Sequence, residues 1–191
     1  MHYSNKTTVI WGENSEKVWN VTVSLSASTA TYDCTNTTDY YCEDPSWVYD
    51  YNKLWGKSRC GYADGHHQDS DRFVWRRCSD PSCAAYIEGT ERVQLAAYSY
   101  DAGVSPMENP SEFMKAFATT IDTETKYMLI MAMDNTGLTT FTLAQADGTV
   151  LESQYVQHKN VCSDNYYEGT VQGLYFGGTC RAPVDVTVIY S

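Results

Sequence analysis

Residues 126–157 have the sequence KYMLIMAMDNTGLTTFTLAQADGTVLESQYVQ, in which apolar and polar residues largely alternate. The alternation predicts three β-strands, at 126–134, 138–145 and 149–157. Asn-Thr-Gly at 135–137 and Ala-Asp-Gly at 146–148 separate them, and each turn places glycine where a positive φ is needed. This stretch therefore predicts an antiparallel β-meander, and it decides the fold class.

The same period of two occurs on both sides of this stretch. It predicts further strands at 17–26, 72–76, 84–88, 91–101, 171–176 and 184–190. In the first of these, apolar residues share one face and Asn20 lies on the opposite, outward face. Residues 27–71 are rich in cysteine and polar residues, which favours loops.

One segment departs from this period. Residues 109–112, Asn-Pro-Ser-Glu, have the composition of a helix start, with Asn as N-cap and Pro at N1. Phe113, Phe117 and Ile121 then recur every four residues, which predicts a short helix near 110–121.

About eight to ten hairpin-linked strands with one helix indicate an all-β fold. We expect an antiparallel meander barrel, with a two-sheet β-sandwich as the alternative. The sequence has no linker composition and no internal repeat, so residues 1–191 are predicted to form a single secreted β domain.

The chain is acidic and rich in aromatic residues. It has 13 Lys and Arg against 24 Asp and Glu, a net charge of −11, together with 16 Tyr and 5 Trp. This charge argues against nucleic acid or an anionic membrane as the main partner, because both need clustered positive charge. The longest apolar run, 127–133, is also far shorter than the roughly 20 residues that span a bilayer.

Seven cysteines favour an oxidising compartment and a disulfide framework over zinc, since no Cys-x2-Cys pair is present. Their odd number leaves one thiol over, either buried and free or linked to a second chain. The candidate disulfide residues are Cys34, Cys42, Cys60, Cys78, Cys83, Cys162 and Cys180.

Three N-glycosylation acceptors, Asn5, Asn20 and Asn36, agree with an extracellular protein. We expect Met1 to replace a removed signal peptide, and we expect the chain to be a secreted glycoprotein.

Catalytic signatures are absent from the sequence, which has no Gly-x-Ser-x-Gly, phosphate loop or His-Glu-x-x-His. We therefore expect no enzyme, no catalytic residue and no cofactor. A hydrolase whose residues converge only in the fold is a further alternative, recognisable by a perturbed carboxylate or His in a cleft. Residues 64–71, Asp-Gly-His-His-Gln-Asp-Ser-Asp, lack the Glu of a calcium loop, and we interpret them as a solvated polar loop rather than a metal site.

Candidate ligand contacts follow from the strand faces. In 149–157, Glu152 and Gln154 share a face with two valines. If that face is inward, both polar groups line a cavity; if the opposite face is inward, they are solvated.

Aromatic residues supply the other half of such a site. Carboxylates pair with an ammonium group, and aromatic rings add cation–π attraction, so the two together bind amines. The alternative for these rings is that they fill a core. The predicted ligand-binding residues are Glu152, Tyr98, Tyr100, Trp75 and Gln154.

Residues 54–64, Leu-Trp-Gly-Lys-Ser-Arg-Cys-Gly-Tyr-Ala-Asp, resemble a stretch of the tick salivary lipocalins, where a Trp-Gly pair precedes a framework cysteine. The resemblance implies a secreted, disulfide-bonded, eight-stranded barrel that sequesters histamine, serotonin or lipids. It carries no family binding residue onto this chain.

Two functions follow as hypotheses. The first is a secreted binding protein that sequesters a small cationic or amphipathic ligand, a biogenic amine or lipid mediator, in a β-barrel cavity. The second is an extracellular β-sandwich that binds glycans or a partner protein through surface aromatic residues. A hollow interior favours the first, and a filled interior favours the second.

Overall fold

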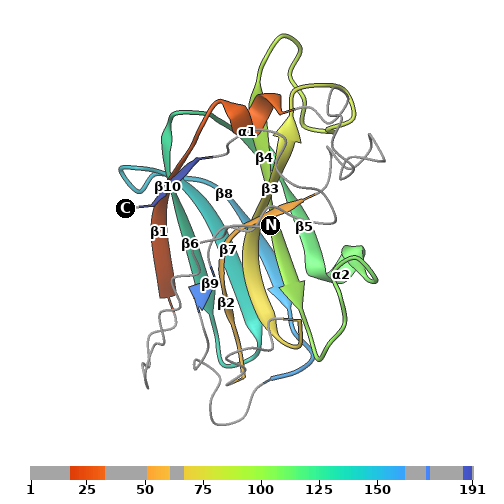
Figure 1. Ribbon diagram of the computed structural model, residues 1–191. Coiled ribbons are helices and arrows are strands. Elements are labelled where there is room, and N and C mark those ends of the chain that lie inside the picture. The colour runs from red at the N-terminus through yellow and green to blue at the C-terminus, as the bar shows by residue number, and fades with distance from the viewer. Residues whose placement is uncertain (1–17, 33–50, 61–66, 162–170, 173–186, 191) are drawn as a thin grey trace.

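The computed structural model describes residues 18–32, 51–60, 67–161, 171–172 and 187–190 (Figure 1). Short helices interrupt the strands at only two places in these ranges. In chain order the elements are β1 Val18–Leu25, α1 Ser28–Thr31, β2 Asn52–Ser58, β3 Ser70–Cys78, β4 Arg92–Tyr100, α2 Pro110–Phe113, β5 Met114–Asp122, β6 Lys126–Met133, β7 Leu138–Gln145, β8 Val150–Gln157, β9 Val171–Gln172 and β10 Val188–Tyr190. None of the helices in these ranges has the length and apolar character needed to cross a membrane.

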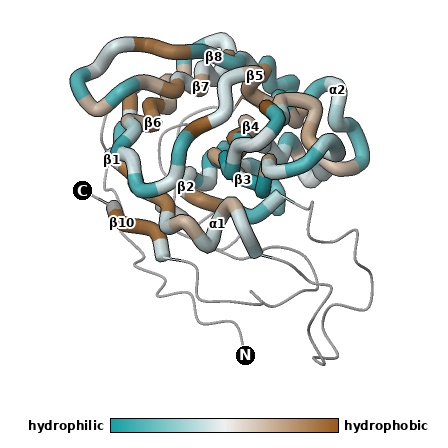
Figure 2. Tube along the Cα trace, turned by 90° about the horizontal axis from the view of Figure 1, so that it is seen from above, coloured by the Kyte–Doolittle hydropathy of each residue, from teal (hydrophilic) through white to brown (hydrophobic). Residues whose placement is uncertain are grey.

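The strands form two antiparallel sheets, which confirms the all-β prediction. The first sheet has the order β10-β1-β6-β7-β8, and the second has the order β5-β4-β3-β2-β9 (Figure 1). Across the described strands no backbone ladder joins one sheet to the other, so the predicted closed barrel is not formed. The strands β5 and β8 lie side by side (Figure 2), but side chains connect them instead of a ladder.

The meander of β6, β7 and β8 confirms the three strands predicted from residues 126–157. Gly137 and Gly148 have φ values of 84° and 90°, as the two tight turns require. In the first turn the Asp134 carboxylate accepts hydrogen bonds from the backbone N–H groups of Thr136 and Leu138, at 2.8 and 2.9 Å. Local chemistry thus fixes both hairpins.

The helix predicted near 110–121 is wrong beyond its first turn. Only Pro110–Phe113 is helical, and the chain continues as β5 from Met114. A spacing of four is even, so the residues Phe113, Phe117 and Ile121 also share one face of an extended chain. All three are buried, because that face covers the core.

Two other segments differ from their predictions. Residues 84–88 form turns, beside the disulfide between Cys78 and Cys83, whereas Asn52–Ser58 forms β2 inside the region expected to be loop. A bulge between Lys53 and Trp55 breaks the alternation of β2, which is why the period of two did not indicate it.

Gly56 lets β2 approach β3 closely. A Cβ at this position would collide with the Asp71 carbonyl oxygen and with Arg72, whose side chain lies across the glycine. The Trp-Gly pair of residues 55–56 therefore has a packing reason in this fold.

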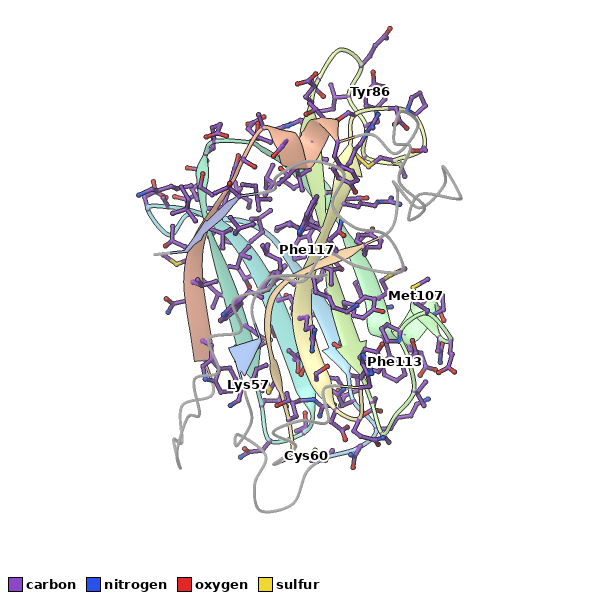
Figure 3. The ribbon with its side chains drawn as sticks, in the orientation of Figure 1. Lys57, Cys60, Tyr86, Met107, Phe113 and Phe117 are labelled. Atoms are coloured by element: carbon purple, nitrogen blue, oxygen red, sulfur yellow. A yellow bond between two sulfur atoms is a disulfide. The ribbon has the colours of Figure 1, made fainter. Side chains whose placement is uncertain are left out.

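Aromatic and aliphatic side chains from both sheets fill the space between them. Phe73 of β3 lies at the centre, with its ring 6.1 Å from that of Phe117 and 5.3 Å from that of Phe141 in the opposite sheet. Phe117 lies near the middle of the sandwich in Figure 3. Other fully or nearly fully buried members are Trp19, Val23, Leu25, Leu54, Trp55, Trp75, Val93, Leu95, Ile121, Leu129, Met131, Leu143 and Val156.

Candidate functional site

The five predicted ligand-binding residues lie in three separate places. Trp75 is fully buried in the core, with its ring 5.8 Å from that of Tyr32. Tyr98 and Tyr100 lie on the outer side of the same sheet, and Glu152 and Gln154 lie where β8 meets β5. The structure therefore brings these residues together only in pairs.

Glu152 and Gln154 join the two sheets. The Glu152 carboxylate accepts hydrogen bonds from the backbone N–H groups of Ala118 and Thr119, at 2.9 and 2.7 Å. Gln154 donates to Glu152 at 2.8 Å and to the Ala116 carbonyl at 3.2 Å. We call this contact the seam.

The seam explains the ionisation of Glu152. Burial opposes its charge, but the two backbone N–H groups outweigh burial and lower the pKa of the carboxyl below its ordinary value. A register shift in β5, opposite residues Gln94 and Ala96, turns both N–H groups toward β8. Glu152 thus lies on the inward face of β8, which it shares with the buried Val156. Its hydrogen-bond donors are the Ala118 and Thr119 N–H groups and Gln154 rather than a bound ligand.

The outer side of the second sheet gathers tyrosines and basic residues. Lys53 Nζ lies 5.5 Å from the ring centroid of Tyr98, and Arg76 Cζ lies 4.9 Å from that of Tyr51. The rings of Tyr98 and Tyr100 meet edge to face at 5.9 Å. We call this surface the tyrosine face, comprising Tyr51, Lys53, Arg72, Arg76, Tyr98 and Tyr100.

Burial shapes the electrostatics of the tyrosine face. It lowers the pKa of the Arg72 guanidinium to about 10, although Tyr100 and Tyr98 favour the charged form. Burial also raises the pKa of Tyr98. Together with Arg72 and Lys53, burial lowers the pKa of His67, whose ring centroid lies 5.1 Å from that of Tyr100. At neutral pH this face therefore carries the positive charges of Lys53, Arg72 and Arg76.

Carboxylates are nearly absent from the strands of this face. Asp71 is the only acidic residue in β2, β3 and β4, and it points to the opposite side, where it contacts Thr139 of the first sheet. Arg76 is held by Gln94, whose Oε1 accepts hydrogen bonds from Nε and Nη2 at 2.9 and 2.7 Å. Arg76 is thus positioned by the sheet itself.

Five ionisable side chains form a cluster that is buried between the sheets. Arg59 lies 3.1 Å from Asp71, 3.3 Å from Asp69 and 3.5 Å from Asp101, all measured between charged atoms. His158 completes this buried ion cluster through Nε2, which lies 2.9 Å from Asp71 Oδ1. All five side chains are almost completely inaccessible, so each charge depends on the others.

His158 has two partners for its other ring nitrogen. Nδ1 lies 2.9 Å from Arg59 Nη2 and 3.5 Å from Asp101 Oδ1. The neutral ring accepts from Arg59, whereas the protonated ring donates toward Asp101. Burial disfavours the charged ring, but Asp71 and Asp101 outweigh it and raise the pKa of His158 above its ordinary value.

Ser99 lies beside the ion cluster, but Ser99, His158 and Asp71 do not form a catalytic triad. Ser99 Oγ donates to Asp71 Oδ1 at 2.5 Å, and His158 contacts the same carboxylate. A nucleophilic serine instead needs the imidazole as its own acceptor. Among the described residues no group of three or more His, Cys, Asp or Glu is arranged to hold a metal.

Asp69 and Asp71 correct the interpretation of residues 64–71 as a solvated loop, since both are buried with Arg59. The sequence held a signal for Asp71, because alternation in β3 places it on the inner face with Phe73 and Trp75. Nothing local indicated Arg59 or His158, which lie far apart in the chain.

Lys57 is a further buried cation inside the sandwich. Its Nζ lies 3.8 Å from the ring centroid of Trp19 in the opposite sheet. Burial lowers the pKa of this lysine to about 8, partly offset by Asp71. Lys57 and Cys60 lie toward the same end of the molecule (Figure 3).

Some covalent features can be placed. Cys78 and Cys83, two of the candidate disulfide residues, form a disulfide with each other, and Cys60 is also disulfide-bonded. Asn20 is exposed on β1, as predicted. Asn5, Asn36 and the other cysteines Cys34, Cys42, Cys162 and Cys180 lie outside the described residues.

Comparison of this chain with protein-family models, with curated proteins and with solved structures found no match in any of the three.

Proposed function

We propose that this protein is an extracellular binding module without chemistry of its own, which recognises an acidic glycan through the tyrosine face. The single observation that carries the proposal is the grouping of Lys53, Arg72 and Arg76 with three tyrosines on one sheet of a chain whose net charge is −11. Aromatic rings stack on sugar faces, and fixed cations pair with carboxylate or sulfate groups.

The filled interior supports an outer-surface ligand. The space between the sheets holds the rings of Phe73, Phe117 and Phe141 in mutual contact. Tyr51, Lys53, Arg76 and Tyr100 are only half-buried, so they are the members that a ligand can reach. The disulfides support an oxidising, extracellular location.

A glycan array with matched neutral, carboxylated and sulfated oligosaccharides tests the proposal directly. We expect the purified full chain to bind acidic members and to bind their neutral counterparts at least tenfold more weakly. Lys53→Gln and Arg76→Gln should each lower the affinity about tenfold, the factor that corresponds to 1.4 kcal/mol. Binding that ignores the acidic groups, or no binding at all, would overturn the proposal.

Two variants control for loss of charge alone. Lys126→Gln removes an exposed cation at the start of β6, and Lys159→Gln removes an exposed one that pairs with Glu112. Both lie outside the tyrosine face, so we expect unchanged affinity. Equal losses in all four variants would mean that net charge, not this surface, governs binding.

A cationic or amphipathic ligand in a lipocalin-like interior stays a prediction of the sequence. One observation favours an interior that accepts cations, since Trp19 already holds the Lys57 ammonium group over its ring. Calorimetric titration with histamine, serotonin and lipid mediators tests it. Heat of binding that persists in Lys53→Gln would support the interior site, and absence of heat with every ligand would exclude it.

A further inference from the structure

The outer side of the first sheet has a surface without charged side chains. The ladders align its residues in rows, and the Thr142 and Ser153 hydroxyls lie 2.9 Å apart on it. We call it the uncharged face, comprising Val18, Asn20, Thr22, Met128, Ile130, Ala132, Thr140, Thr142, Ser153 and Tyr155.

This face is open to solvent in the described part of the chain. Val18 and Tyr155, at two of its corners, are 52% and 55% exposed, and Met128 and Ile130 are half-buried. Among the described strands, Lys126 is the cation nearest to it, one row beyond Met128. An uncharged, partly apolar surface on a chain with a net charge of −11 is a candidate for coverage by another group.

The acceptor Asn20 lies within the uncharged face. Asn20 is exposed and stands directly opposite Ile130, followed across the sheet by Thr142 and Ser153. A group attached to its amide nitrogen therefore starts at one edge of the face. Tyr155 lies three strands away, roughly 14 Å at 4.7–4.9 Å per strand, within reach of a short oligosaccharide.

We propose that an N-linked glycan on Asn20 covers the uncharged face. The proposal rests on the extracellular location proposed above. A lipid-linked oligosaccharyl diphosphate is the donor: the Asn20 amide nitrogen bonds to the anomeric carbon, and the bond from that carbon to the diphosphate oxygen breaks. The amide loses one proton, and the lipid diphosphate leaves.

The chemistry of the face suits a neutral oligosaccharide. The Tyr155 ring and the Ile130 side chain offer apolar surface to the faces of sugar rings. Thr140, Thr142 and Ser153 offer hydroxyls that donate and accept hydrogen bonds. No charged side chain on the face would remain desolvated beneath a neutral glycan.

A second copy of the chain is the competing occupant. Without the glycan, two uncharged faces can pack together as sheets do, because no like charges oppose each other at the contact. The bare protein is therefore expected to associate through this surface, and the glycosylated protein to stay monomeric.

Secretion of the full chain from cultured eukaryotic cells tests the proposal. Peptide mass spectrometry should find a glycan on Asn20. Endoglycosidase trimming of the folded protein leaves a single sugar on Asn20 and keeps its amide neutral. It should raise the binding of a hydrophobic dye and shift the sedimenting species from monomer toward dimer. Asn20→Gln should behave like the deglycosylated protein, and adding Ile130→Lys should restore the monomer.

Asn5→Gln and Ile87→Lys are the matched controls. Asn5→Gln removes another acceptor, and Ile87→Lys adds a charge at an exposed position off the face, so the second should not rescue Asn20→Gln. A secreted, disulfide-bonded chain with bare Asn20 overturns this proposal alone. So does a glycan whose trimming changes neither dye binding nor the monomer–dimer distribution. A chain that stays inside the cell and carries no glycan at any of the three acceptors would contradict the extracellular location on which both proposals rest.

Discussion

At the scale of single residues, the buried ion cluster has the largest consequences. Asp71 accepts from Ser99 and Thr139 and faces both Arg59 and His158, with no exposure to solvent. Burial opposes its charge, but His158 and Arg59 hold the pKa of Asp71 below its ordinary value. Removing one partner of a buried pair leaves the other charge uncompensated, which costs more than the pair itself contributes.

Asp71→Asn should therefore destabilise the fold by about 3–5 kcal/mol at pH 7. Urea unfolding followed by tryptophan fluorescence measures this loss. Asp122→Asn is the matched control, because its pair with Arg92 lies at the surface and should contribute less than about 1 kcal/mol. Equal losses in both variants would contradict the role given to Asp71.

His158 should make stability depend on pH. The raised pKa of His158 means that the folded state holds the proton more tightly than the unfolded state does. The stability that protonated His158 contributes is therefore complete below about pH 6.5, the ordinary pKa of histidine, and is lost as the pH rises through the pKa of His158 in the folded state. The difference in unfolding free energy between the native protein and His158→Gln should therefore shrink from pH 6 upward. Lys57 titrates in both proteins, so it cancels in this comparison. A difference that stays constant to pH 9 would show that His158 does not titrate as described.

At the scale of elements, the seam between β5 and β8 replaces a backbone ladder with one carboxylate. Glu152→Gln keeps the shape but removes the charge that both backbone N–H groups contact, so we expect a loss of about 1–2 kcal/mol. Amide exchange at Ala118 and Thr119 should accelerate in this variant. The protection of these two amides, taken relative to the intrinsic exchange rate at each pH, should also fall in the native protein when the pH falls through the lowered pKa of Glu152, because that contribution is lost on protonation.

Glu112→Gln provides the control for the seam. Its carboxylate is exposed and pairs with Lys159 at 2.7 Å, away from β5 backbone groups. We expect unchanged exchange at Ala118 and Thr119. Exchange rates that rise equally in Glu112→Gln would mean that general charge loss, not the seam, protects these amides.

At the scale of the whole molecule, the packed interior is the feature that bears on function. Phe73 contacts aromatic rings from its own sheet and from the opposite sheet. Phe73→Ala should destabilise the protein by about 3–5 kcal/mol, as expected when a cavity opens in a filled core. Exposed Ile87→Ala should change stability by less than about 0.5 kcal/mol. A cost below 1 kcal/mol for Phe73→Ala would indicate an interior that is already hollow there.

Alternation and turn chemistry predicted much of the fold. The meander of β6 to β8, the faces of β1 and the strand β4 all follow from them, because each depends on neighbours in the chain. The helix at 110–121 was mistaken because a spacing of four fits both a helix and one side of a strand. The strand β2 was missed because its bulge interrupts the period.

The sequence by itself determined the fold class, the three strands of the meander and the outward position of Asn20. Only the tertiary structure decided that Arg59, Asp71 and His158 meet and that Glu152 joins the two sheets. It also decided that Tyr98 and Tyr100 lie on the outer side of their sheet, in a cluster separate from the one between the sheets. The physical reason is range. Strands and turns are encoded by residues a few positions apart, whereas a buried ion pair or a surface patch depends on which strands become neighbours, and that is settled only when both sheets pack.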